Sequence, residues 1–413
     1  MPPSQATHDT ASDASATAVT TSELEPGHSP PPPGAPIQLL PQDALHNVLG
    51  RLSLREALSC RPVCRLFRDA LSSSPFLSSL PPLRLLALRH PRSSANGGGR
   101  DSHGSCLHAL DPSLRRWIRL PLFFLPFPSS SPVTASPSLL YLWVDAAAAS
   151  PGDAKIPRTL AVCNPLSGSH RLLPPLGSAW SRHGTVLAGP GGAVLVLTQL
   201  AALAYSPGSD RWLKFSLNLP SKPRSPVLMA GAIFALCDVG TPWRSLWRLF
   251  SCRLLDLGVW APLKRPEWGD VLNILKRPRL LAGAGGGRIL MIGGLRSSLD
   301  AEAPCSTVLI LRLDLETMEW DEAGRMPPEM YHCFGGGGLG HAAAAGGANN
   351  KVKVFGGDGR VWFSGRRVRG KLAMWEEDDK GGCGVWSWVD GVPGCNEGIY
   401  RGFVFDAGFS AMP

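Results

Sequence analysis

The sequence has no Cys-x-x-Cys pair, although it contains ten cysteines among 413 residues. The two closest, Cys60 and Cys64, have no histidine or further cysteine beside them at the spacing of a zinc site. The N-terminus is polar and lacks the apolar core of a secretory signal, so structural disulfides are not expected. Cys383 and Cys395 flank a turn-rich segment, but two thiols do not make a closed zinc site. We therefore predict buried free thiols and no bound metal, in a protein of the nucleus, the cytoplasm or both.

Long apolar runs are also missing. Residues 120–144 carry no basic side chain but are broken by five prolines, and the apolar pieces of 184–208 are short and bounded by glycine and proline. A helix that spans a membrane needs about 20 predominantly apolar residues without such breaks. Both stretches are predicted to be buried β-strands, and no membrane partner is expected.

The signatures of common catalytic sites are absent as well. There is no GxSxG elbow, no phosphate loop, no HExxH helix and no GxGxxG joined to a strand and a helix. The run Gly335–Gly338 is not followed by Lys-Ser/Thr, so it does not indicate a phosphate-binding loop and is interpreted as part of a flexible loop. His332 and His341 lie near that run, where a solvated or core role is favoured over a ligand role. The sequence predicts no catalytic site and no cofactor.

Positive charge is present but dispersed. The formal net charge is +9, and residues 1–36 contain four acidic residues and no lysine or arginine, so the positive charge belongs to the rest of the chain. Basic residues form only short clusters such as Arg366–Arg369, without interleaved aromatics. Nucleic-acid binding is not supported. Residues 1–36 themselves, rich in Ser, Thr, Ala and Pro, predict a flexible tail with a stiff polyproline end.

Residues 37–80 show a helical pattern. Pro41 suits a first helical turn, where its missing N–H is no loss. Ser53 and Glu56 have the spacing of a capping box, which predicts a second short helix from Ser53, and a third helix is expected to begin near Pro62. A stretch this short buries its own apolar faces poorly, so a partner is expected to complete it. The stripe of the first helix consists of Leu45, Val48, Leu49 and Leu52.

This segment resembles an F-box, a motif with an LP start, a leucine-rich middle and a VC-basic-x-aromatic-basic segment in its last helix. Phe67 stands where that family often has tryptophan, and Pro62 precedes the VC pair. The resemblance implies binding to a Skp-type adaptor that links to cullin and RING subunits. The alternative is a three-helix cap that merely packs on the following domain. The residues expected to form the F-box surface, some packing internally and others entering the partner, are Leu40, Pro41, Leu45, Val48, Leu49, Val63, Cys64 and Phe67.

The rest of the chain, residues 81–413, repeats a unit at intervals of roughly 40–60 residues. In each copy an apolar strand meets a polar turn opened by Asp, Asn or Ser, and a large aromatic then starts the next strand. The copy that starts at Asp314 has the clearest pattern. It is preceded by a strand that glycines flank on both sides, within Gly285–Gly294. The copies start at Asp111, Ser206 and Asp314, with a histidine variant at Asn164 and a shorter version at Asp256.

These copies resemble degenerate kelch repeats, as in the plant F-box/kelch-repeat proteins and the group that includes the floral regulator Unusual Floral Organs. The resemblance implies a mainly β fold, with a kelch-type, galactose-oxidase-like β-propeller after a small three-helix F-box. Five or six blades can be traced, the last closing near Trp386, Trp388 and the strand Gly402–Asp406. Galactose oxidase itself uses tyrosine and histidine ligands for copper, and this chain has four tyrosines in no such constellation.

The resemblance implies a substrate-recognition subunit of an SCF-type E3 ubiquitin ligase that performs no chemistry itself. The propeller would recruit a protein client, whose identity the sequence does not reveal. The alternative left open is a propeller scaffold or transcriptional cofactor that acts without ligase assembly.

Overall fold

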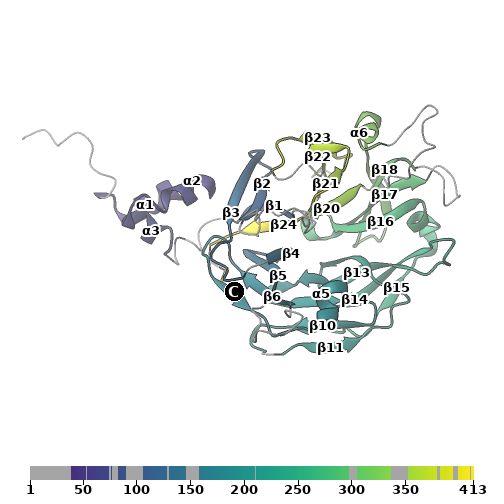
Figure 1. Ribbon diagram of the computed structural model, residues 1–413. Helices are drawn as coiled ribbons and strands as arrows, with labels where there is room; N and C mark the ends of the chain where they lie inside the picture. The colour runs from purple at the N-terminus through teal and green to yellow at the C-terminus, as the bar shows by residue number, and fades with distance from the viewer. Residues whose placement is uncertain are drawn as a thin grey trace, which may run out of the picture.

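The structure is a computed structural model and describes residues 39–52, 54–73, 76, 82–89, 106–127, 130–145, 158–209, 211–296, 305–335, 352–378, 382–393, 399–409 and 411–413. These residues form a small helical domain followed by six four-stranded antiparallel sheets (Figure 1). The residues of the predicted tail, 1–36, lie outside the described part.

The three helices of the N-terminal domain are short and lie together beside the propeller (Figure 1). Helix α1 is Gln42–Leu49, α2 is Leu54–Cys60 and α3 is Arg65–Ala70. The sequence placed Pro41 in the first turn of this helix. In the structure Pro41 is instead the N-cap residue before α1, with an extended backbone. Ser53 of the predicted capping box lies outside the described residues.

The third helix begins later than predicted. Pro62 lies in the turn before it, and Cys64 is extended, with φ −155° and ψ 168°. The Cys64 thiol sulfur accepts a hydrogen bond from the Phe67 backbone N–H over 3.4 Å, so Cys64 acts as the N-cap. A cap satisfies one of the backbone donors that a helix start leaves without a partner.

Six blades make up the propeller, which the sequence left at five or six. The first blade is assembled from both ends of the domain, because the C-terminal strand β24 pairs with β1 along seven residues, from Leu83 with Ala407 to Arg89 with Arg401. The predicted closing strand Gly402–Asp406 is therefore the inner strand of the first blade. In order from inner to outer, the first three blades are β24 (Arg401–Ala407), β1 (Leu83–Arg89), β2 (Cys106–Asp111) and β3 (Arg116–Pro121); β4 (Ser130–Ser136), β5 (Leu139–Asp145), β6 (Arg158–Cys163) and β7 (His170–Leu172); and β8 (Thr185–Ala188), β9 (Val194–Leu197), β10 (Ala201–Tyr205) and β11 (Leu213–Ser216).

The remaining blades repeat the same meander, and the predicted Trp386 and Trp388 lie in the outer strand of the last. The inner strands contact one another in the order β24, β4, β8, β12, β16, β20 and back to β24, so the ring is closed. The last three blades are β12 (Arg224–Met229), β13 (Ala232–Asp238), β14 (Trp247–Arg253) and β15 (Ala261–Leu263); β16 (Leu275–Ala282), β17 (Arg288–Arg296), β18 (Cys305–Asp314) and β19 (Trp320–Arg325); and β20 (Lys353–Gly357), β21 (Arg360–Gly365), β22 (Val368–Glu376) and β23 (Val385–Val389).

Helical turns connect some blades. Helix α5 (Ser178–His183) lies between blades two and three, and α6 (Pro328–Cys333) lies between blades five and six. The hairpin between β20 and β21 turns at Asp358 and Gly359, both with positive φ (51° and 73°), which is the backbone that a two-residue hairpin requires. Short 3-10 helices are η3 (Pro190–Gly192), η4 (Pro266–Trp268), η5 (Val271–Asn273) and η6 (Ala284–Gly286).

The hydrophobic core of the propeller lies between the blades. Six clusters of buried side chains each combine one face of a sheet with the facing side of the next sheet, and a seventh cluster lies inside the helical domain. Successive residues of a strand face opposite sides, so Ile289 packs between blades four and five while Leu290 packs between blades five and six. Because both faces are covered, β5 is buried without a break from Leu139 to Val144. This explains why the uncharged stretches of the sequence are strands.

Candidate protein-docking surfaces

The helical domain has a small core of its own. Leu45 and Leu49 from α1 pack with Ala57 of α2, Ala70 of α3 and Phe76, and each of these side chains is buried. The ring centroids of His46 and Phe76 lie 4.9 Å apart, which adds an aromatic contact at the edge of this core. The helices are therefore held together by a few large side chains, in keeping with their short length.

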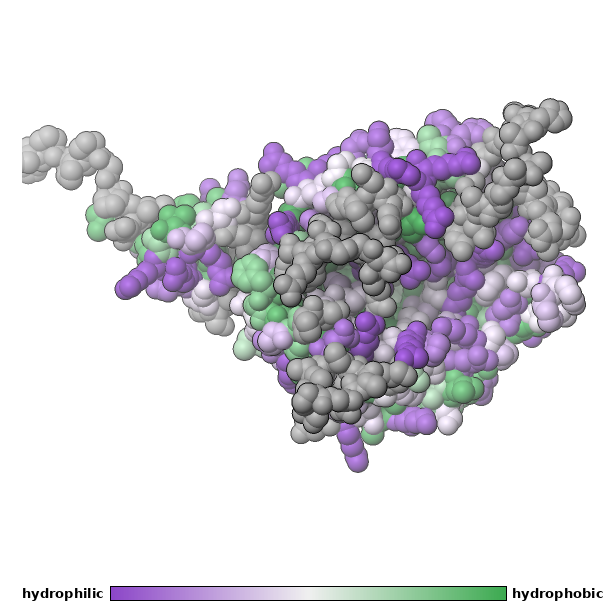
Figure 2. Space-filling model, in the orientation of Figure 1, coloured by the Kyte–Doolittle hydropathy of each residue, from purple (hydrophilic) through white to green (hydrophobic). Residues whose placement is uncertain are grey.

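Other apolar side chains of the helical domain point to solvent. Val63 is 67% exposed and Val48 is 46% exposed, whereas Leu45, three residues before Val48, is 1% exposed. Figure 2 shows hydrophobic side chains gathered at the surface of this domain. Exposed apolar groups that cluster on a small domain typically mark a site of protein interaction. The exposed apolar set of the helical domain is Leu39, Leu40, Val48, Val63 and Leu66.

The structure thus divides the residues predicted for the F-box surface. Leu45 and Leu49 form the internal core, and Phe67 is half-buried against it. Cys64 is half-buried and caps α3. The members left on the surface are Leu40, Pro41, Val48 and Val63.

Sequence reasoning missed two members of the exposed set, Leu39 and Leu66. Leu66 is the second residue of α3 and stands at the unspecified x position of the VC-basic-x-aromatic-basic segment, so the motif gave no signal for it. Leu39 directly precedes the LP pair, so a doublet of leucines before the helix was the available signal.

One arginine ties the helical domain to the propeller. Arg61 donates from Nη1 to the backbone oxygen of Leu166 over 2.6 Å, and its guanidinium lies 6.0 Å from the centre of the Phe409 ring. Leu166 belongs to the turn after β6, and Phe409 follows the end of β24. We call this side of the propeller, where the inner strands end, the exit face.

Asn164 joins two segments of the exit face, the turn after β6 and the residues that follow β24. Its Oδ1 accepts from the backbone N–H groups of Leu166 and Ser167 over 2.9 and 3.3 Å, which forms the predicted Asn-opened turn. Its Nδ2 donates to the backbone oxygens of Gly408 and Ala411, both over 3.0 Å. The side chain is fully buried, and all of its hydrogen-bonding capacity toward the chain is in use.

Two further repeat turns, at Asp111 and Asp314, form as predicted. Asp111 and Asp314 each accept two backbone N–H groups through Oδ1, at distances between 2.8 and 3.2 Å. Their following tryptophans also pack between neighbouring elements: Trp117 donates through Nε1 to the backbone oxygen of Asp390 over 3.0 Å, and Trp320 lies edge-on to Trp268 at 5.9 Å. Both tryptophans are half-buried and pack against the hydrophobic clusters between the blades.

The opposite side of the propeller, where the inner strands begin, carries arginines. We call it the entry face. Arg224 and Arg401 are the first residues of β12 and β24, and Arg277 and Arg279 lie near the start of β16. Arg224 donates through Nη2 to the backbone oxygen of Arg277, and Arg279 donates through Nη1 to Ser225 Oγ, both over 3.4 Å. These contacts bring the starts of blades four and five together. The arginine cluster is Arg224, Arg277, Arg279 and Arg401.

Electrostatics within this cluster are unfavourable. Burial, followed by the positive charges of Arg279 and Arg277, lowers the pKa of Arg224 to about 10, against a smaller opposing effect of Asp238. Burial and the charge of Arg401 likewise lower the pKa of Arg279. The Arg224 guanidinium also lies 5.1 Å from the centre of the Trp247 ring, a favourable cation–π distance.

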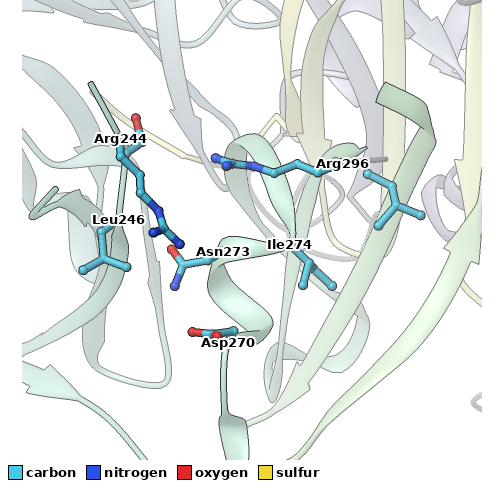
Figure 3. Close-up of a pocket in the computed structure, with 8 residues that line it drawn as sticks. Arg244, Leu246, Asp270, Asn273, Ile274 and Arg296 are labelled. Carbon is cyan, nitrogen blue, oxygen red and sulfur yellow. The ribbon is translucent and has the colours of Figure 1, made fainter. Parts of the chain in front are cut away.

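A pocket of about 300 Å³ opens beside the cluster, between blades four and five. The side chains of Arg244 and Arg296 enter it from opposite sides, with Asn273 and Asp270 between them (Figure 3). The Asn273 side chain has a structural hydrogen bond, because its Oδ1 accepts from the Trp247 backbone N–H over 2.9 Å. The Nε of Arg296 is buried with no hydrogen-bond partner among the described residues. The apolar lining is Leu246, Ile274 and Leu295.

Cysteines are more varied in exposure than predicted. Nine of the ten lie in the described ranges, and all nine are free. Cys106, Cys163, Cys237 and Cys252 are buried, but Cys333 and Cys383 are exposed, because they lie at the end of α6 and in the turn before β23 rather than on an interior strand. Cys395 lies outside the described residues, so its distance from Cys383 stays untested.

No group of three or more His, Cys, Asp or Glu side chains is placed to hold a metal ion in the part of the chain that the structure describes. Within that same part, the helices are too short or too polar to cross a membrane.

Comparison with known proteins assigns the family. Residues 37–79 match the F-box domain, and residues 276–327 match the Kelch motif. Over 395 residues the chain is 49% identical to SKP1-interacting partner 15 of Arabidopsis thaliana, a match that covers 92% of this chain and 99% of the relative. The chain belongs to the plant F-box/kelch-repeat proteins.

More distant relatives of this F-box/kelch protein cover less of it. It is 30% identical over 341 residues to Protein ABERRANT PANICLE ORGANIZATION 1 of Oryza sativa subsp. japonica, with 74% of each chain covered. Among solved structures, the β-propeller domain of the Trilobed protease from Pyrococcus furiosus is similar with a TM-score of 0.38 and 11% identity, over 66% of this chain and 72% of that chain. The family assignment and the six-bladed fold confirm the predicted architecture of an F-box followed by a kelch-type propeller.

Proposed function

We propose that this F-box/kelch protein is the substrate-recognition subunit of an SCF-type E3 ubiquitin ligase. Its F-box would bind a Skp-type adaptor that links to cullin and RING subunits, and its propeller would bind a protein client. The observation that carries the proposal is the exposed apolar set of the F-box, which lies over a core that is already complete without it. The relative named as a SKP1-interacting partner supports the same assignment.

The two ends of the molecule suit the two halves of this function. The F-box contacts the exit face through Arg61, whereas the arginine cluster lies at the start of the inner strands. Strand β24 has seven residues between Arg401 and Ala407, which at about 3.3 Å per residue separates the two faces by about 20 Å. A client on the entry face would leave the F-box accessible to the adaptor.

The proposed mechanism requires no chemistry from this chain. Holding a client and a ubiquitin-charged enzyme in one assembly raises their effective concentration toward each other without any new catalytic contact. We therefore propose that the protein is a non-catalytic adaptor, and that specificity comes from the propeller loops.

Co-purification with a Skp-type adaptor tests the proposal. Val48→Asp with Val63→Asp places charges in the exposed set without touching the core, and this variant is expected to weaken adaptor binding by about tenfold or more. Leu255→Asp with Val259→Asp is the matched control, because both side chains are exposed on the turn between β14 and β15. The proposal fails if the wild type does not bind the adaptor or if both double variants bind equally well.

The competing function is a scaffold or transcriptional cofactor without ligase assembly. That alternative predicts a wild-type protein that captures clients but leaves their ubiquitination and lifetime unchanged. Measuring client half-life with the wild type and with the Val48→Asp, Val63→Asp variant separates the two, because only the ligase function depends on the exposed set.

We also propose that the protein acts in the nucleus, the cytoplasm or both. The nine described cysteines are free, which is typical of proteins kept in a reducing compartment. Imaging of a fluorescent fusion tests this, and accumulation in the secretory pathway would contradict it.

A further inference from the structure

The entry face concentrates positive charge that the protein's own carboxylates leave largely unpaired. Within the described ranges, no member of the arginine cluster forms an ion pair with an aspartate or glutamate. Asp238 acts on Arg224 electrostatically but only weakly, and its Oδ1 already accepts hydrogen bonds from the backbone N–H groups of Gly240 and Leu246. An arrangement of like charges without counter-charges is costly unless an outside anion offsets it.

The backbone at the cluster is also unusual. Ser225 and Arg277 have φ of 45° and 54°, in the left-handed region that side chains other than glycine seldom adopt. Each precedes a proline, and each lies at a register shift of its inner strand, between Arg224 and Val227 in one case and between Lys276 and Arg279 in the other. Bulges of this kind redirect side chains and are common next to functional sites. Two neighbouring blades therefore use the same strained device at the same place.

A purely structural role does not use the full cluster. Arg224 and Arg279 each join blades four and five through one nitrogen of a guanidinium that has five N–H donors. Arg277 and Arg401 are exposed, and their side chains make no hydrogen bond within the described part of the chain. Joining the blades thus explains two of the arginines and leaves the other two free to meet a ligand.

The surroundings favour a peptide over a nucleic acid. Asp270 interrupts the positive charge in the adjoining pocket, so the basic side chains do not form the continuous track that a nucleic-acid backbone follows. Trp243, 88% exposed in the loop that also supplies Arg244, offers an apolar contact beside the charges. Arginine next to an exposed aromatic is the combination enriched at the centres of protein interfaces.

We propose that the arginine cluster binds an acidic segment of the client, with its carboxylate or phosphate side chains against Arg277 and Arg401 and a neighbouring side chain in the pocket of Arg244 and Arg296. The inference rests on the proposed function, since it names the chemistry of the client that the propeller would recruit. The planar guanidinium groups suit either anion, because both offer paired oxygen acceptors.

Binding of labelled peptides to the full chain tests the inference. A glutamate-rich peptide, the same peptide with phosphoserine, and a neutral glutamine version are titrated against the wild type and against Arg277→Glu with Arg401→Glu. The matched control is Arg119→Glu with Arg253→Glu, since these arginines are exposed on β3 and β14, away from the cluster. We expect one or both acidic peptides to bind the wild type and the control. The cluster variant is expected to bind them at least about tenfold more weakly, and added salt should weaken binding to the wild type.

The outcomes are separable. Preference for phosphoserine over glutamate, or the reverse, identifies which anion the cluster takes. Equal binding of the neutral peptide, equal binding by the two double variants, or displacement of the peptide by a duplex oligonucleotide at physiological salt would overturn the inference. Thermal unfolding shows whether the cluster variant is folded, and adaptor binding is measured in parallel. If the variant still binds the adaptor but no longer binds the peptide, the loss belongs to the cluster. If the wild type does not bind the adaptor, only the ligase assignment is contradicted.

Discussion

Arg61 of the F-box and Leu166 of the second blade are joined by a 2.6 Å hydrogen bond, although 105 residues separate them in the sequence. The same guanidinium faces the ring of Phe409, so one side chain contacts two distant parts of the exit face. Arg61, a half-buried residue, thus links the F-box to two parts of the propeller.

Arg61→Ala is predicted to loosen the F-box without unfolding either domain. The substitution removes a charge-assisted hydrogen bond, which contributes about 1 kcal/mol at a half-exposed site. Limited proteolysis should cut the connection between α3 and β1 faster, while the thermal unfolding of the propeller stays unchanged. Arg51→Ala, an exposed residue after α1, serves as the control. Equal cleavage rates for the two variants would contradict the prediction.

Asn164→Ala is predicted to be among the most damaging single changes in the propeller. It deletes two donated and two accepted hydrogen bonds at a fully buried position and leaves their backbone partners without replacements. We expect a loss of about 2–4 kcal/mol in the free energy of unfolding, measured in urea. Asp314→Ala removes the two hydrogen bonds of a similar turn at a position that is only half-buried, and should cost about 1 kcal/mol or less. The prediction is wrong if the two losses are alike.

Leu49→Ala and Val48→Ala are predicted to differ sharply despite being neighbours. Leu49 is buried in the F-box core, so its truncation should cost about 2–5 kcal/mol, enough to unfold these short helices. Val48 is exposed, so its truncation should change the stability of the helices by about 0.5 kcal/mol or less. Amide hydrogen exchange in residues 42–70 reads out both variants. Similar protection in the two would show that the core is arranged differently.

Stability is predicted to fall at alkaline pH because of Cys163. Burial raises the pKa of this thiol from 9.0 to about 12. Since the folded state holds the proton more tightly, the stabilisation is complete below pH 9, where the unfolded thiol is also protonated, and it is lost as pH rises toward 12. Urea titrations between these limits should show the decline. Cys163→Ala should flatten the pH dependence, and an unchanged slope in that variant would assign the decline to other groups.

Much of the fold was accessible from the sequence because its local signals and its packing agree. Asp111 and Asp314 open turns that their own carboxylates close, and uncharged runs such as Leu139–Val144 become strands covered on both faces. The start of α3 was misplaced because Pro62 is equally compatible with a turn and a first helical turn. The thiol cap that settles the matter is a weak, context-dependent hydrogen bond.

The docking surfaces were less accessible. Periodicity marks Leu45 and Val48 alike as apolar, and only the packing of α3 and Phe76 shows which of them is covered. The arginine cluster was not predicted at all. Its members are separated by up to 177 residues and converge only because successive blades return to the same ring.

The pairing of β24 with β1 has a consequence for synthesis of the chain. Arg84 and Asp406 form an ion pair across 322 residues, so the first blade waits for its inner strand until almost the whole propeller has been translated. At about 5–20 residues per second, that wait is roughly 15–60 seconds. Throughout it, the apolar edge of β1 stays open to wrong partners. A chain that ends before residue 401 therefore lacks β24, so its first blade stays incomplete and its ring cannot close.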